Sequence, residues 1–225
     1  IYGVSADSSA VYGVNNLNGQ SFISRIDRND DTVKTVTYDN TYISIVYVYN
    51  GVLYAFSDRS TDSERTSTLH CIDPDTLEEI STTDISDLGC GIYSVTGIED
   101  ILYFVPAETL QGGSNHIVGT YHISTGEINS IDFQKVAHHI LNVGDKLYIT
   151  HGNLVTGEGT ALSVYERETG EITSYDLGVW PAQITVHDGF LYVMSENSVV
   201  KFDLQTMEKQ ASVTIPLDDG YYLSG

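Results

Sequence analysis

A repeat of about 45 residues runs through the sequence and limits what the chain can fold into. An apolar residue followed by tyrosine recurs five times, and the tyrosines of these pairs are Tyr12, Tyr54, Tyr103, Tyr148 and Tyr192. The steps between them are 42, 49, 45 and 44 residues. A β-branched apolar residue stands seven positions before each pair, with turn-forming residues between. This periodicity predicts a series of similar supersecondary units that pack against one another.

The last repeat, residues 187–216, shows most clearly what each unit is expected to form. Leu191 and Val193 alternate with residues of the opposite face, as in a strand with one side buried. Asp188-Gly189 is typical of a hairpin turn, because glycine tolerates the positive φ that two-residue turns need. A second turn pattern joins two further strands. It consists of an apolar residue, which is usually followed by a carboxylate residue and, a few positions later, by a threonine. Each repeat therefore predicts four antiparallel strands, and the chain is predicted to be an all-β protein built of β-propeller blades.

This last repeat resembles the bacterial YVTN-type and quinoprotein-like β-propeller repeats. The resemblance lies in three segments, GVWPAQI at 178–184, DGFLYV at 188–193 and KFDLQT at 201–206. It extends over all five repeats and is close only in the last. It implies a propeller architecture and little about chemistry, because such repeats build the scaffold on which a function is placed.

We therefore predict a single β-propeller domain over residues 1–225, with blades at approximately 1–42, 43–90, 91–136, 137–180 and 181–222. A closed five-bladed ring is favoured, because unclosed blades would expose apolar flanks that invite aggregation. The alternative is that the five repeats are part of a ring of six to eight blades. The two arrangements differ in whether Ile1 and Leu223 lie side by side in the folded chain.

The charge balance narrows the kinds of partner that the chain can have. The sequence holds 31 acidic and 10 basic residues, a formal net charge of -21. Such a field repels phosphate backbones and anionic lipid surfaces, so we expect no nucleic-acid partner and no membrane insertion. The chain has neither an initiator methionine nor a signal peptide, so we expect a processed portion of a longer protein. The acidic, lysine-poor composition favours an extracellular or cell-surface location in a bacterium, with the signal peptide removed.

The two cysteines, Cys71 and Cys90, are predicted to be unpaired. In the repeat register Cys71 falls near the end of a third strand, and Cys90 falls in the loop after the fourth strand. These points are expected at opposite ends of one blade, beyond the roughly 7 Å between Cα atoms that a disulfide can span.

The loops that follow the second and fourth strands vary between repeats, and variable loops on a fixed scaffold are where function is most often placed. If the ring closes, aromatic, imidazole and amide side chains converge near one mouth of the central channel. These candidate ligand-binding residues are Trp180, Tyr221, Tyr222, Tyr93, His138, His139 and Gln183. Stacking and directional hydrogen bonds of this kind suit a glycan, peptide or protein ligand. The alternative is that the aromatic residues only cover the ends of the blades.

No catalytic residue, cofactor or metal site is predicted with them. His138 and His139 are adjacent in a strand, so their side chains are expected on opposite faces. The predicted innermost strands contain no Asp or Glu, which glycoside hydrolysis would require as a pair. The expected function is therefore a non-catalytic binding module. The alternatives are a propeller lyase or hydrolase that uses His139 or His151 as a base with a divalent ion, and a purely structural spacer.

Overall fold

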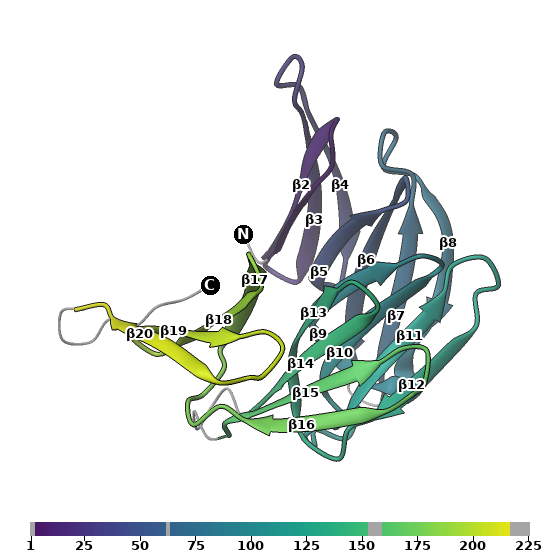
Figure 1. Cartoon of the computed structure of the whole chain (residues 1–225). Helices are drawn as coiled ribbons and strands as arrows, with labels where there is room; N and C mark the ends of the chain where they lie inside the picture. Colours follow the sequence, from purple (N-terminus) through teal and green to yellow (C-terminus); the bar gives the residue numbers. More distant parts are fainter. Residues whose placement is uncertain (1–2, 62–63, 153–158, 217–225) are drawn as a thin grey trace. The chain divides into compact units, whose positions relative to one another are not determined.

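The computed structural model describes residues 3–61, 64–152 and 159–216, and over these ranges the protein is all-β. Consecutive strands form five separate four-stranded antiparallel sheets, which confirms the all-β class and the four strands per repeat. The chain divides into two compact units. Unit 1 comprises Ile1–Asn115 and Gly119–Ser130, and unit 2 comprises His116–Val118 and Ile131–Gly225. Each unit is described by itself below (Figure 1).

The first three sheets follow one another along the chain. The first sheet contains β1 (Gly3–Ala6), β2 (Ala10–Leu17), β3 (Gln20–Asp27) and β4 (Val33–Asp39). The second contains β5 (Tyr42–Tyr49), β6 (Val52–Ser60), β7 (Arg65–Ile72) and β8 (Glu79–Asp84). After the short 3-10 helix η1 (Ser86–Leu88), the third contains β9 (Cys90–Ile98), β10 (Ile101–Glu108), β11 (Ile117–His122) and β12 (Ile128–Asp132).

Two further sheets complete the described part of the chain. The fourth contains β13 (Ala137–Val143), β14 (Lys146–His151), β15 (Ala161–Glu166) and β16 (Ile172–Asp176). The fifth contains β17 (Gln183–His187), β18 (Phe190–Ser195), β19 (Ser198–Asp203) and β20 (Lys209–Thr214). In every sheet the strands lie side by side in chain order, so each sheet is open, with its first and fourth strands at the edges.

The predicted hairpin turns form for the reason that the sequence indicates. Asp188 and Gly189 have φ values of 48° and 77°, the left-handed conformation that a two-residue turn requires at both positions. In β18 the residues Leu191 and Val193 are buried while their neighbours are half-buried, which confirms the period-two alternation.

The connection between third and fourth strands is held by the carboxylate of the second repeated pattern. The Asp203 carboxylate accepts hydrogen bonds from the backbone N–H groups of Gln205 and Thr206, at 3.0 and 2.9 Å. These hydrogen bonds, with that of Thr206 first, lower the pKa of Asp203 below its usual value. Asp73 does the same with Thr76 in the second sheet, which explains why the spacing from carboxylate to threonine recurs.

The hydrophobic cores lie between neighbouring sheets of the same unit. In unit 1, Tyr12 and Ile23 of the first sheet pack in one cluster with Ile43 of the second. Phe56 of the second sheet and Phe104 of the third are both fully buried, and their ring centroids are 5.1 Å apart. In unit 2 a similar cluster joins residues of β14 and β15 to residues of β17, β18 and β19. Pairs of first strands, β1 with β5, β5 with β9 and β13 with β17, are in contact.

The two cysteines are both buried and free, as predicted. The position expected for Cys90 was wrong, because this residue opens β9 instead of lying in the preceding loop. The fourth strand ends early, at Asp84, and the 3-10 helix with Gly89 at φ 118° reverses the chain before Cys90. Burial raises the pKa of the Cys90 thiol to about 11.

Among the described residues, none belongs to a helix with the length and apolar character needed to cross a lipid bilayer.

Candidate ligand-binding site

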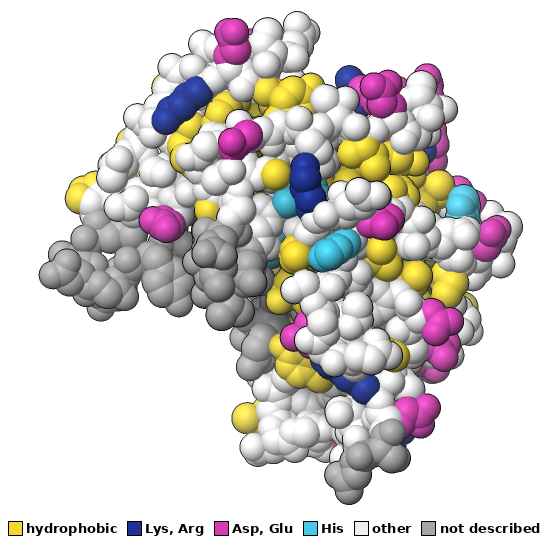
Figure 2. Space-filling model, turned by 90° about the horizontal axis from the view of Figure 1, so that it is seen from below, with side chains coloured by type: hydrophobic (Ala, Val, Ile, Leu, Met, Phe, Trp, Pro, Cys, Tyr) yellow, Lys and Arg dark blue, Asp and Glu magenta, His cyan; other side chains and the backbone are white. Residues whose placement is uncertain are grey.

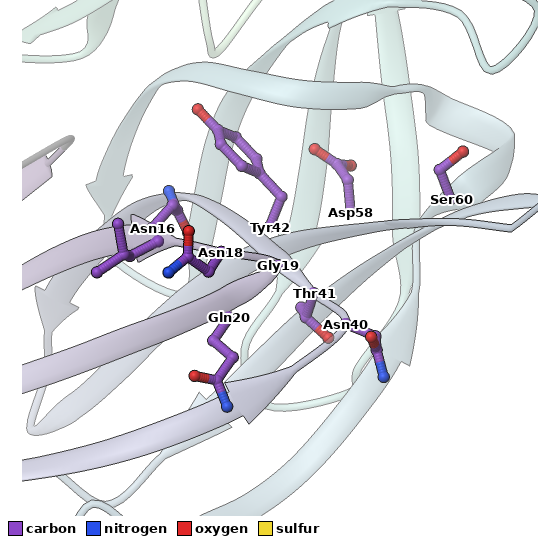
Figure 3. A pocket seen from close by; sticks show the side chains of 10 residues that line it. Asn16, Asn18, Gly19, Gln20, Asn40, Thr41, Tyr42, Asp58 and Ser60 are labelled. Atoms are coloured by element: carbon purple, nitrogen blue, oxygen red, sulfur yellow. The ribbon is translucent and has the colours of Figure 1, made fainter.

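A polar pocket of about 420 Å³ lies in unit 1, where the first and second sheets meet (Figure 3). Three segments form it: the hairpin that joins β2 to β3, the connection from β4 to β5, and the end of β6. Its lining residues are Asn16, Leu17, Asn18, Gly19, Gln20, Asn40, Thr41, Tyr42, Asp58 and Ser60. These segments lie in or next to the loops that follow the second and fourth strands of a repeat. These are the loops in which the sequence leads us to expect the function.

Local sequence determines how these segments turn. Asn18 and Gly19 have φ values of 54° and 78°, so the Asn-Gly pair makes the tight turn that closes the β2–β3 hairpin. Asn40 also adopts a positive φ, of 53°, which asparagine tolerates better than most residues. Tyr42 and Asp58 are directly opposite each other across β5 and β6, so their side chains stand together on one wall of the pocket.

The back of the pocket is held rigidly by side chains that bond to the backbone of β5. Asn16 donates from Nδ2 to the Ile43 carbonyl at 2.9 Å, and its Oδ1 accepts from the Ile43 N–H at 3.2 Å. The Ser21 hydroxyl donates to the Thr41 carbonyl at 2.7 Å and also accepts from the Ile43 N–H, at 2.9 Å. Because these groups satisfy one another, Asn16 positions the pocket wall instead of offering its amide to a ligand.

Asp58 is the ionisable group of the pocket, and only 9% of its surface is exposed. Burial raises the pKa of its carboxyl above the usual value, against the opposing effect of the hydrogen bond from the Gly91 backbone. The Gly91 N–H donates to Asp58 Oδ2 at 2.9 Å. The carboxyl group is therefore fixed in position and poorly hydrated, which strengthens any hydrogen bond that it makes to a bound group.

The exposed groups at the rim are mostly neutral. Asn18, Gln20, Asn40 and Ser60 are exposed, and together they supply hydrogen-bond donors and acceptors. Tyr42 is 45% exposed and offers part of its ring. On the face seen in Figure 2, acidic side chains are spread over the surface and the basic side chains are few and separate. An anionic ligand would meet a protein of net charge -21, so the surroundings favour a neutral or cationic one.

Of the residues predicted from the sequence, the structure brings His138 and Trp180 together in unit 2. Their rings are stacked, with centroids 6.2 Å apart and planes inclined by 27°. Gln183 is exposed at the start of β17, and burial lowers the pKa of His139 to about 4. Tyr93 belongs to unit 1, where it is 46% exposed.

The remaining predicted residues, Tyr221 and Tyr222, lie outside the described ranges, as do Ile1 and Leu223. The convergence of the predicted set around one channel mouth stays a prediction.

The alternation expected at His138 and His139 does not hold, because β13 contains a β-bulge there. Ala137 pairs with His151 and His139 pairs with Thr150, so His138 is the extra residue of the bulge. A bulge interrupts the alternation of side chains and bends the strand. Ser44 in β5 and Tyr93 in β9 are the extra residues at the equivalent position of their sheets. The bulge is thus a repeated feature of three sheets, and its differing residue types do not reveal it in the sequence.

His151 is a structural residue of the fourth sheet. It is 3% exposed, its Nδ1 donates to the Val136 carbonyl at 3.2 Å, and its Nε2 lies 2.8 Å from the Ser163 hydroxyl. Ser163 Oγ is in turn 3.0 Å from Ser174 Oγ. Burial lowers the pKa of His151 to about 4, so the ring is neutral and Nε2 accepts the Ser163 proton. With both nitrogens engaged, His151 has no free position for a metal ion or a substrate proton.

The second sheet also contains a hydrogen-bonded serine and histidine, but here the serine is on the second strand and the histidine is on the third. Ser57 stands three positions after the repeat tyrosine, as His151 does, and its Oγ is 2.8 Å from His70 Nε2. His70 Nδ1 donates to Glu79 Oε2 at 2.7 Å. This order of groups is similar to that of a serine hydrolase, but Ser57 is only 5% exposed and the Tyr38 ring lies edge-on at 5.4 Å from His70. Because Ser57 is buried between its strands, the pair serves as a cross-strand hydrogen bond.

Within the described residues no group of three or more His, Cys, Asp or Glu side chains is arranged to hold a metal ion. In comparisons with protein-family models and with curated proteins, nothing matches the chain.

Proposed function

We propose that the protein is a non-catalytic binding module that takes a neutral sugar in the pocket of unit 1. The observation that carries this proposal is the combination, in one hollow of about 420 Å³, of the half-exposed Tyr42 ring with several amide groups. Hydroxyl groups of a sugar both donate and accept hydrogen bonds, as amide groups do. The apolar face of a sugar ring packs on an aromatic side chain. The volume lies within the usual range for small-molecule sites, about 300 to 1,000 Å³.

The rigid back wall supports recognition of this kind. Asn16 and Ser21 fix the start of β5, so the backbone that carries Tyr42 does not have to be ordered when a ligand arrives. Binding to a site that is already formed loses less conformational entropy. A peptide or protein ligand is the alternative, and it would require a more apolar surface than the amide-rich rim offers.

We also propose that the five sheets are blades of a β-propeller of the YVTN-like kind, closed as a five-bladed ring. Support comes from the five sheets of four consecutive strands and from the contacts between first strands within each unit, since first strands surround the axis of a propeller. The composition supports an extracellular or cell-surface site of action, where polysaccharides are accessible. An enzymatic function that uses His151 as its base has less support, because both nitrogens of His151 are engaged within the fourth sheet.

The test is to measure, by isothermal titration calorimetry, the binding of the full chain to glucose, galactose, mannose, N-acetylglucosamine and their oligosaccharides. For a sugar that binds, Tyr42→Ala is expected to weaken binding by about tenfold or more, because the stacking surface is lost. Trp180→Ala is the matched aromatic control in unit 2 and is expected to leave the affinity unchanged. Loss of binding in Trp180→Ala with full binding in Tyr42→Ala would contradict the proposed site.

A further inference from the structure

A second hollow lies beside the pocket in unit 1. It has a volume of about 250 Å³ and is lined by Tyr42, Ser44, Ile45, Gly91, Ile92 and Tyr93. Among the described residues, Tyr42 is the one that lines both hollows. At about 250 Å³ the second hollow is smaller than the roughly 300 to 1,000 Å³ of an independent small-molecule site. It is therefore better interpreted as an extension of the first hollow than as an independent site.

The boundary between the two hollows is a fixed structure. Asp58, which lines the first hollow, accepts a hydrogen bond at 2.9 Å from the backbone of Gly91, which lines the second. Ser44 Oγ accepts from the Ile92 N–H and donates to the Phe56 carbonyl, both at 3.2 Å. These bonds tie β9 to β5 and β6, so the distance between the hollows does not depend on a mobile loop.

The lining of the second hollow includes two exposed aromatic rings. Tyr42 and Tyr93 are 45% and 46% exposed, and Tyr93 is the extra residue of the bulge in β9. Bulges redirect side chains and are frequent beside binding sites. Gly91, two residues earlier, has φ 65°, which a residue with a side chain adopts only with strain. The local backbone is thus built to hold Tyr93 at the edge of the hollow.

The two hollows differ in chemistry. The first carries amide groups and the Asp58 carboxyl, which fix the orientation of hydroxyl groups. The second carries Ile45 and Ile92 beside the two tyrosines, and its hydroxyl from Ser44 already serves the backbone. A site that is polar at one end and aromatic with aliphatic groups at the other suits consecutive sugar residues, the first held by hydrogen bonds and the next by stacking.

We propose that the two hollows are adjacent subsites for neighbouring residues of one neutral oligosaccharide, with Tyr42 between them. This inference rests on the proposed function and specifies its ligand as a sugar chain instead of a single sugar. Tyr93 is the residue that distinguishes the two, because it contacts only the second sugar residue. Tyr42 contributes to the binding of both.

The test is calorimetry of the full chain with the monomer, dimer and tetramer of glucose, galactose, mannose and N-acetylglucosamine. For at least one series, the tetramer is expected to bind about tenfold more tightly than the monomer. Tyr93→Ala is expected to remove this gain and to leave the monomer affinity within about twofold, whereas Tyr42→Ala weakens both. Tyr93→Phe keeps the ring and is expected to keep the gain, and thermal melts establish that each variant is folded.

The outcomes separate the two proposals. Suppose that a monomer binds and that its binding depends on Tyr42. If longer chains then bind no more tightly, or if their gain in affinity persists in Tyr93→Ala, the second subsite is overturned and the proposed function stays in place. Absence of binding to every sugar overturns both. A tetraproline peptide could also bind more tightly than any sugar tetramer and lose this binding in both alanine variants. This result would overturn the choice of a sugar as the ligand but would keep the two hollows as the binding surface.

Discussion

Burial of His151 makes the stability of unit 2 depend on pH in a direction that can be worked out. The pKa of His151 is lowered from 6.5 to about 4, first of all because the ring is desolvated. The unfolded chain therefore binds a proton at a pH where the folded chain does not. Folding is unaffected above pH 6.5, and stability is lost as the pH falls from 6.5 towards 4.

The size of the effect follows from the two pKa values. At pH 5 the unfolded histidine is mostly protonated and the folded one mostly neutral, which costs about 2 kcal/mol relative to pH 7.5. His151→Gln removes the titrating group, so the variant is expected to lose about 2 kcal/mol less than the wild type over this range. His187→Gln is the matched control, because His187 is exposed, and it is expected to change the free energy of unfolding by no more than about 0.5 kcal/mol.

The assay is urea denaturation at pH 7.5 and pH 5, in which tryptophan fluorescence is the signal that reports unfolding. Trp180 is the single tryptophan of the chain and belongs to unit 2, as His151 does, so the signal reports the relevant unit. An equal pH dependence in the wild type and in His151→Gln would refute the reasoning. If the variant does not fold, the imidazole proton resonances of the wild type provide the test, because His151 is expected to show no titration between pH 7.5 and pH 5.

Further predictions concern the core and the thiols. Phe56→Ala removes a fully buried ring and is expected to destabilise unit 1 by about 3 to 5 kcal/mol in denaturant titrations. Gly119→Ala places a Cβ against the Phe104 ring and is expected to lower the melting temperature. Gly13→Ala, whose Cβ would meet only the Gly3 carbonyl oxygen at an ordinary contact distance of 3.9 Å, is expected to leave it nearly unchanged. Both cysteines are expected to react with Ellman's reagent only after denaturation, and rapid reaction of Cys90 in the native protein would contradict its burial.

The strands could be predicted from the sequence because the residues that form them also repeat. Apolar residues such as Leu191 and Val193 alternate with half-buried neighbours, and Asp-Gly and Asn-Gly turns have few alternative conformations. The bulges were not predictable in this way. The bulged residues are Ser44, Tyr93 and His138, which differ in size and shape, and each bulge is set by the pairing with the next strand.

The candidate site was only partly accessible to sequence reasoning. The cluster of amide residues around Asn18 and Asn40 was a usable signal, because it falls in two connections on the same side of neighbouring repeats. Aromatic residues drew attention to Trp180 instead, which stacks on His138. The sequence offers His151 as a candidate base because it does not reveal that Ser163 and the Val136 carbonyl occupy the two ring nitrogens.

The most direct test of the central claim is a map of the ligand on the protein by NMR. Backbone amide shifts of the full chain are recorded while the best-binding oligosaccharide is added. The expected result is that the largest changes fall on Gly19, Thr41 and Gly91, which surround the two hollows of unit 1. Changes confined to unit 2, with the Trp180 indole resonance among them, would contradict the account.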